Sequence, residues 1–214
     1  MLRCTLSTVE FTLGLIMREI SSAHNITANE FLAMLPQEFR EIVEGIRHAK
    51  RAGIRPLPSS SFIDKSSIAD PALRRRLLDK IATLVDENLA GRSEMCAQFS
   101  LLLARALTKL GYPSSAVTGE ATYFQNGQNV FSWRHSWVRT GNELIDGNVD
   151  VLSENPVIPR SIAVQPYWGP PSLTPPDRRL RQDHSARTPE DLDVNNIWWP
   201  ELEVWINAEC LQSW

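Results

Sequence analysis

The chain has 214 residues, 43% of them hydrophobic, and a formal net charge of −3. This length can bury a full hydrophobic core, and one domain with appendages is the simplest expectation. The charge gives no reason to expect binding to nucleic acid or to an anionic membrane, and no apolar run reaches the length of a membrane span.

The three cysteines are Cys4, Cys96 and Cys210. An odd number at wide spacing predicts reduced thiols in a cytoplasmic protein rather than a disulfide framework. Their spacing matches no zinc signature, so we expect no metal and no cofactor. Glu10 interrupts the N-terminal apolar stretch, and this pattern does not predict a signal peptide.

Residues 1–56 are expected to form an N-terminal helical region. Apolar periodicity predicts helices over 6–22 and 37–53, and Thr27 with Glu30 fits a capping box before a short helix. A connection rich in proline and serine follows over 54–66 and separates this region from the rest of the chain.

The pair Asp70-Pro71 predicts a helix start, with aspartate as the N-cap and proline in the first position. This helix is expected to run to about residue 90. Its run Arg74-Arg75-Arg76 is interpreted as a solvated face. The positions predicted to be buried are Leu73, Leu77, Leu78, Ile81, Leu84 and Val85.

A second helix is predicted over Ser93 to Gly111, with Ser93 as the N-cap. It is apolar on most of its surface, so we expect it to be buried. Cys96 would lie in its first turn, at the third position, where the free N–H groups and the helix dipole favour a thiolate. The simpler alternative is that Cys96 is a small residue of the core.

After this helix the apolar pattern becomes that of strands. We expect a strand over 114–124, or two strands with a bend at Gly119, then a hairpin turn at Asn126-Gly127 and a partner strand over 130–139. A turn at 140–142 leads to a further strand, ELID, over 143–146. An antiparallel sheet is therefore predicted for this part of the chain.

Strand alternation places His135 on one face with two aromatic neighbours, Trp133 and Trp137. The next hairpin can bring Asp146 beside His135, because adjacent strands lie only about 4.8 Å apart. Cys96, His135 and Asp146 then supply the nucleophile, the general acid and base, and the orienting carboxylate of a thiol triad. The backbone N–H of Cys96 is one donor for the oxyanion, and the sequence does not identify a second.

Each member of this triad also has a simpler interpretation. His135 can be a satisfied histidine among aromatic residues, and Asp146 can be a turn aspartate that bonds its own backbone. Asn148 and Asp150 are rivals for the third position of the triad.

Residues 153–214 form an extension rich in proline and tryptophan, expected to wrap over the core. Within it, residues 161–168 read as a short edge strand, and the stretch 155–200 is either a disordered insert or a substrate-binding lid. The tryptophans at the end are expected to dock on the body; exposed together, they would mark a protein partner. These residues are Trp198, Trp199, Trp205 and Trp214.

The runs EMCAQFSLLLARALTKLGYPSSAVTGEA and FSWRHSWVRTGNELIDGNVD resemble the transglutaminase-like superfamily of cysteine enzymes. The resemblance covers about residues 75–152 and lies closest to bacterial peptidase-type members. It implies an α+β fold with a papain-like or transglutaminase-like core over 67–152, in which a buried helix carrying cysteine packs on an antiparallel sheet. The catalytic residues that it implies are Cys96, His135 and Asp146.

The expected function is cleavage of a peptide or protein amide bond through an acyl-enzyme on Cys96, with Trp133 and Trp137 contacting the substrate. A protein-glutamine transamidase or deamidase of the same superfamily is an alternative. A peptide-binding module that retains the fold without catalysis is the alternative from another class.

Overall fold

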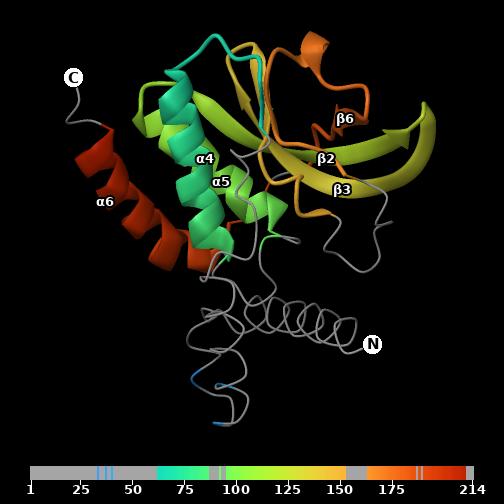
Figure 1. The fold of residues 1–214 in the computed structure, drawn as a ribbon. Helices are drawn as coiled ribbons and strands as arrows, with labels where there is room; N and C mark the ends of the chain where they lie inside the picture. The colour runs from blue at the N-terminus through green and yellow to red at the C-terminus, as the bar shows by residue number, and fades with distance from the viewer. Residues whose placement is uncertain are drawn as a thin grey trace.

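The protein is an α+β structure in which three helices pack on a six-stranded, mostly antiparallel open sheet (Figure 1). The computed structural model describes residues 62–86, 92, 95–152, 163–186, 188 and 190–210, with isolated positions 33, 37 and 40. The strand order is β1-β5-β4-β3-β2-β6. The predicted α+β class is confirmed, while the predicted N-terminal helices lie outside the described residues apart from those three positions.

The centre of the sheet is a meander of three strands, as the sequence predicts. The turn between the first two uses Asn126 and Gly127 at φ 52 and 76, the left-handed values that a tight hairpin requires. The first strand continues through Gly119 without a break, and a Cβ there would lie 2.1 Å from the carbonyl oxygen of Arg181 on the neighbouring strand. The three strands are β2 (Ser114–Gln125), β3 (Gln128–Thr140) and β4 (Glu143–Asp146).

Three more strands come from segments that the sequence reads mainly as proline-rich connections. They are β1 (Ile63–Asp64), β5 (Tyr167–Gly169) and β6 (Arg178–Gln182), with a 3-10 turn, η3 (Pro171–Leu173), between the last two. The short strand predicted over 161–168 is present only at its end, as β5, and the prediction that it is an edge strand is wrong, because β5 lies between β4 and β1 and pairs with both. Strands this short, one of them mostly charged, carry too few alternating residues to be recognised.

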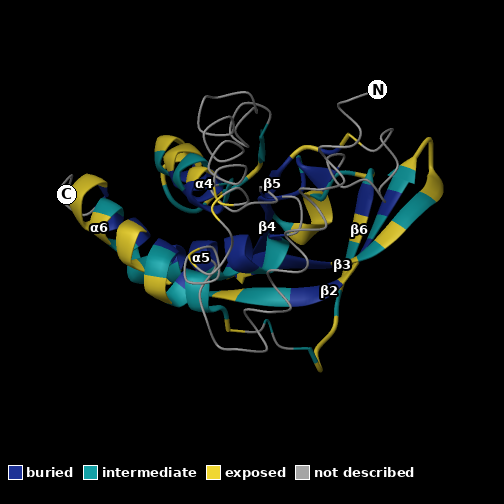
Figure 2. Cartoon of the chain, turned by 90° about the horizontal axis from the view of Figure 1, so that it is seen from below, coloured by how far each residue is buried: buried dark blue, intermediate teal, exposed yellow. Residues whose placement is uncertain are grey.

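The three helices cover one face of the sheet. They are α4 (Pro71–Asp86), α5 (Cys96–Lys109) and α6 (Trp199–Glu209), the last preceded by a π-helical turn, η4 (Val194–Trp198). Their apolar side chains form one core with Val138, Ile145 and Trp168 of the sheet. Figure 2 shows this arrangement, with buried residues where α5 faces the strands and exposed residues on the outer side of α6.

The first helix begins as predicted. The Asp70 carboxylate accepts hydrogen bonds from the N–H groups of Ala72 (2.8 Å) and Leu73 (3.2 Å), and Pro71 is the first helical residue. All the predicted core positions of α4 are buried except Leu73, which is intermediate. The helix is described to Asp86, and the residues that follow directly lie outside the described part.

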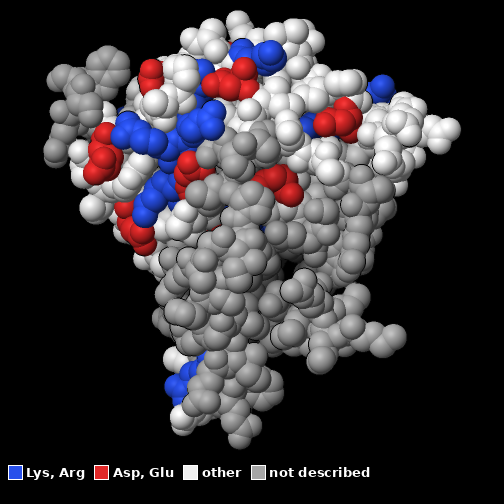
Figure 3. All heavy atoms as spheres, in the orientation of Figure 1, with Lys and Arg blue, Asp and Glu red and all other residues white. Residues whose placement is uncertain are grey.

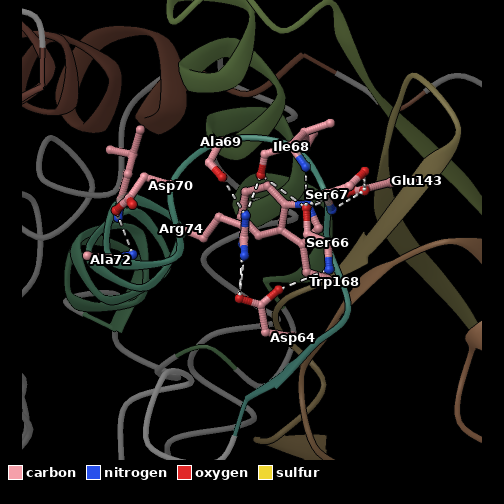
Figure 4. Close-up of polar contacts among 11 residues, drawn as sticks. Asp64, Ser66, Ser67, Ile68, Ala69, Asp70, Ala72, Arg74, Glu143 and Trp168 are labelled. Atoms are coloured by element: carbon pink, nitrogen blue, oxygen red, sulfur yellow. Dashed lines mark hydrogen bonds and ion pairs between the residues drawn. The ribbon is translucent and has the colours of Figure 1, made fainter. Parts of the chain in front are cut away.

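The interpretation of Arg74 as solvated is wrong. Its side chain is buried and donates to the Asp64 carboxylate at 2.7 and 3.0 Å, and also to the carbonyls of Ile68 and Ala69 (Figure 4). The guanidinium also lies over the Trp168 ring, 5.9 Å from its centroid. A run of three arginines on a helix start therefore contains one residue that ties α4 to β1.

The C-terminal tryptophans dock where the structure describes them. Trp198 is buried, and Trp199 and Trp205 pack against the core, whereas Trp214 lies outside the described residues. On the face seen in Figure 3, lysine and arginine side chains lie among aspartate and glutamate side chains. Within the described residues, no helix combines the length and apolarity needed to cross a membrane.

Candidate active site

Cys96 is the first residue of α5, two positions earlier in the helix than the sequence predicts. Met95 is the N-cap and makes no side-chain capping bond, so the prediction of Ser93 as N-cap is wrong. The helix starts late because the chain first makes a turn in which the N–H of Met95 donates to the carbonyl of Arg92 at 3.0 Å. Cys96 therefore lies at the positive end of the helix, and it is only partly buried.

A buried arginine fixes the turn before Cys96. Arg92 is 1% exposed and donates to the two carboxylate oxygens of Asp150 at 2.9 and 2.8 Å. The side-chain amide of Asn148 donates to the Arg92 carbonyl at 2.7 Å. Asn148 and Asp150, the two rivals for the third position of a triad, thus hold the chain in front of Cys96.

Asp146 is the carboxylate that meets His135. Its Oδ1 lies 2.7 Å from Nε2 of the imidazole, and both residues are buried. The register explains the contact: β4 pairs with β3 through Val138 and Ile145, so His135 and Asp146 are diagonal neighbours on one face. The predicted cross-strand contact is confirmed, and the structure supplies the register that the sequence left open.

Arg178 completes the buried cluster, and the sequence did not identify it. From β6 its Nη1 donates to Oδ2 of Asp146 at 2.8 Å, and its Nη2 donates to the carbonyl of Gln165 at 2.6 Å. Its side chain has no exposed surface. Arg178 belongs to a short charged strand in a proline-rich stretch, and only its contact with Asp146 reveals its position in the site.

The charges of this cluster control its protonation. Burial lowers the pKa of His135, but the charge of Asp146, hydrogen bonds with Asp146 and Cys96, and the charge of Cys96 outweigh it and raise the pKa to about 10. Burial raises the pKa of Asp146, yet His135 and Arg178 together hold it below its ordinary value. At neutral pH the pair is therefore an imidazolium and a carboxylate.

The three predicted catalytic residues are thus brought together. Nε2 of His135 faces Asp146, and the hydrogen bond with Cys96 joins the same imidazole to the start of α5. His135 and Asp146 meet at the end of β4, because Asp146 is its last residue and His135 lies three residues from Val138, which forms the last β3–β4 pair with Ile145. The imidazole of His135 can therefore exchange a proton with the Cys96 thiol while Asp146 holds its Nε2 in place.

The two tryptophans beside His135 have different surroundings. Trp137 is 2% exposed and stacks on the imidazole at 6.3 Å between centroids, a position that supports the ring. Trp133 stacks on Phe131 and lines an open pocket of about 460 Å³. Gly119, the register partner of His135, lines the same pocket. The candidate substrate contact is therefore Trp133.

Within the described part of the chain, no group of three or more histidine, cysteine, aspartate or glutamate residues is arranged to hold a metal ion. Comparison with protein-family models, with curated proteins and with solved structures finds no match to this chain. The functional argument therefore depends on the chemistry of the residues themselves.

Proposed function

We propose that this protein is a thiol-dependent enzyme that cleaves a peptide or protein amide bond through an acyl-enzyme on Cys96. The observation that carries the proposal is the buried pair of His135 and Asp146 beside a cysteine at the start of a helix. In a catalytic triad the nucleophile contacts a base, and the base contacts an orienting carboxylate; Cys96, His135 and Asp146 have this arrangement. The sequence resemblance to transglutaminase-like cysteine enzymes, with their papain-like core, supports the same chemistry.

In the first half of the reaction the Cys96 thiolate attacks the carbonyl carbon of the amide. A neighbouring imidazolium and the positive helix end both favour the thiolate. The carbonyl oxygen gains the negative charge. The free N–H groups in the first turn of α5 are the candidate donors to this oxyanion. His135 then protonates the leaving nitrogen, the C–N bond breaks and a thioester remains on Cys96.

In the second half, water attacks the thioester. The imidazole, now neutral, accepts a proton from the water as its oxygen bonds to the carbonyl carbon. Breaking the C–S bond releases the carboxylic acid and returns the thiolate and imidazolium. Hydrolysis is favoured over transfer because water is always present, whereas transfer needs an amine bound well enough to compete with it.

Asp146 and Arg178 have supporting roles in this scheme. Asp146 fixes the tautomer and orientation of His135 through Nε2 and stabilises its positive charge. Arg178 balances the carboxylate through Oδ2, which allows the charge of Asp146 to remain buried.

A library of peptides that release aminomethylcoumarin tests the proposal directly. We expect cleavage by the wild-type chain and none by Cys96→Ala, with a burst of coumarin equal to the enzyme concentration if the second half is slower. Mass spectrometry of the quenched burst should show the acyl group on the peptide that contains Cys96.

The same assay separates the alternatives. Incorporation of dansylcadaverine into a glutamine peptide without hydrolysis would replace hydrolase with transamidase, and ammonia release from that peptide would indicate a deamidase. Cleavage unchanged in Cys96→Ala would contradict the proposal. Peptide binding with no Cys96-dependent product would instead indicate a binding module.

A further inference from the structure

Tyr123, on β2, has a hydroxyl group that is buried without a hydrogen-bond partner. The residue is 1% exposed, and its Oη and the Oε1 of Gln98 are the two such buried side-chain atoms found among the described residues. An unpaired buried hydroxyl is unfavourable and is uncommon in folded proteins. Its persistence calls for a physical explanation.

The position of Tyr123 places it next to Arg178, the arginine that bonds the Asp146 carboxylate. In the sheet register Tyr123 pairs with Arg178 of β6 on one side and with Phe131 of β3 on the other. It therefore shares a sheet face with Arg178 and His135, the two groups that bond Asp146.

The charges around the phenol agree with this placement. Burial raises the pKa of Tyr123 well above its ordinary value, with further increases from Asp146, Cys96 and Asp177 against a decrease from Arg178. Asp146 acts most strongly among these charged groups. The phenol therefore keeps its proton and can act only as a neutral hydrogen-bond donor or acceptor.

Asp146 has room for another donor. A carboxylate can accept about four hydrogen bonds, and the described contacts of this side chain are one bond from His135 and one from Arg178. The bond from His135 is charge-assisted only while the imidazole is protonated, and hydrogen bonds to an ionised donor are about twice as strong as neutral ones. Asp146 thus loses stabilisation whenever His135 gives up its proton.

We propose that Tyr123 is a positioning residue whose hydroxyl donates to the Asp146 carboxylate when His135 becomes neutral. Tyr123 and Asp146 lie on the same face of the sheet and have Arg178 as a common neighbour. It lowers the free energy of the stage with neutral imidazole, which is the stage that must activate water. Its catalytic consequence rests on the proposed function, whereas its effect on His135 does not.

The experiment measures the titration of His135 by NMR in chains with labelled histidine. Both chains carry Cys96→Ala, which removes the thiolate and so represents the uncharged thioester stage. The titration of His135 is compared between Cys96→Ala alone and Cys96→Ala with Tyr123→Phe. Loss of the donor should raise the pKa of His135 by about one unit, a tenfold change in the proton equilibrium. An unchanged pKa would overturn the proposal, whether or not the chain proves to be an enzyme.

Stability provides the second readout. Because the Tyr123 hydroxyl has no partner in this structure, Tyr123→Phe should leave the Tm unchanged or raise it. Tyr167→Phe is the matched control, since its buried hydroxyl donates to the carbonyl of Pro170 at 2.6 Å. The control should lower the Tm and leave the His135 titration unchanged. A fall in Tm for Tyr123→Phe with no change in titration would show a purely structural tyrosine.

In the active chain, Tyr123→Phe should slow release of the acyl group about tenfold and leave the acylation burst unchanged. Equal slowing of both steps would contradict a role tied to neutral His135.

Discussion

Strand β4 carries a buried carboxylate at each end, and the two ends differ in how these charges are satisfied. Glu143 accepts four bonds from neutral donors, which are the N–H and Oγ of Ser67, the Oγ of Ser66 and the indole of Trp168. Figure 4 shows this cluster beside the residues at the start of α4. Asp146 instead faces two cationic groups, His135 and Arg178, beside a cysteine that is partly exposed.

Under the proposed function, the comparison separates a structural carboxylate, Glu143, from a catalytic one, Asp146. At Glu143 every identified donor is fixed by the fold, and none of them gains or loses a proton near neutral pH. At Asp146 one partner is a histidine with a displaced pKa, and Tyr123, which pairs with the other partner Arg178, has an unpaired hydroxyl. Unsatisfied and titratable groups gather at sites of function rather than at sites that only hold the fold.

The largest expected effect is on the reactivity of Cys96 in Asp146→Asn. The amide preserves the shape but removes the charge that supports the imidazolium, and we expect reactivity with iodoacetamide at pH 6 to fall by about 10²- to 10³-fold, the loss expected when the thiolate reverts to an ordinary thiol. Circular dichroism and thermal unfolding check that the chain remains folded. Reactivity within a factor of two of the wild type would show that Asp146 is structural, like Glu143.

The next effect is the pH dependence of stability contributed by His135. Its pKa is raised from 6.5 to about 10 in the folded chain, so the stabilisation is complete below pH 6.5 and is lost as the pH rises through about 10. Its size is on the order of a few kcal/mol.

Urea unfolding of the wild type and His135→Gln, measured at intervals from pH 6 to pH 10.5, gives this contribution as a difference. The difference should shrink across the interval. A constant difference would mean that the histidine keeps an ordinary pKa. The depressed pKa of Asp146 acts at the other end of the scale, where stability falls as acid protonates it.

The smallest effect is that of Glu143→Gln, the same carboxyl-to-amide change at the opposite end of β4. It weakens bonds from buried donors, and we expect a loss of about 2 kcal/mol in the free energy of unfolding. The alkylation rate of Cys96 should remain within a factor of two of the wild type. A large fall in that rate would erase the distinction between the two carboxylates.

Local patterns predicted the central part of the fold. The cap at Asp70, the turn at Asn126-Gly127 and the strand alternation around His135 each depend on a few adjacent residues, and the structure confirms them. The strand around His135 is one of these elements, and α5 with Cys96 and β4 with Asp146 were also predicted from local patterns, so the candidate triad could be predicted before its register was known.

Long-range contacts account for what the sequence did not predict. Arg178 and Asp146 are 32 residues apart, and Glu143 and Ser66 are 77 apart. Neither contact follows from periodicity, because it depends on which short strands join the sheet at its two edges. The buried Arg74 was misread for the same reason, since its partner Asp64 lies on β1, a strand of two residues.

The central claim is that Cys96 reacts as a thiolate held beside a protonated His135. The most direct measurement is the alkylation rate of Cys96 against pH, followed by peptide mass spectrometry, with Cys210 as internal control because burial raises the pKa of that thiol. The account predicts fast modification of Cys96 that persists to about pH 5–6 and is slowed by His135→Ala. Titration of Cys96 near pH 8.5, unaffected by that substitution, would contradict it.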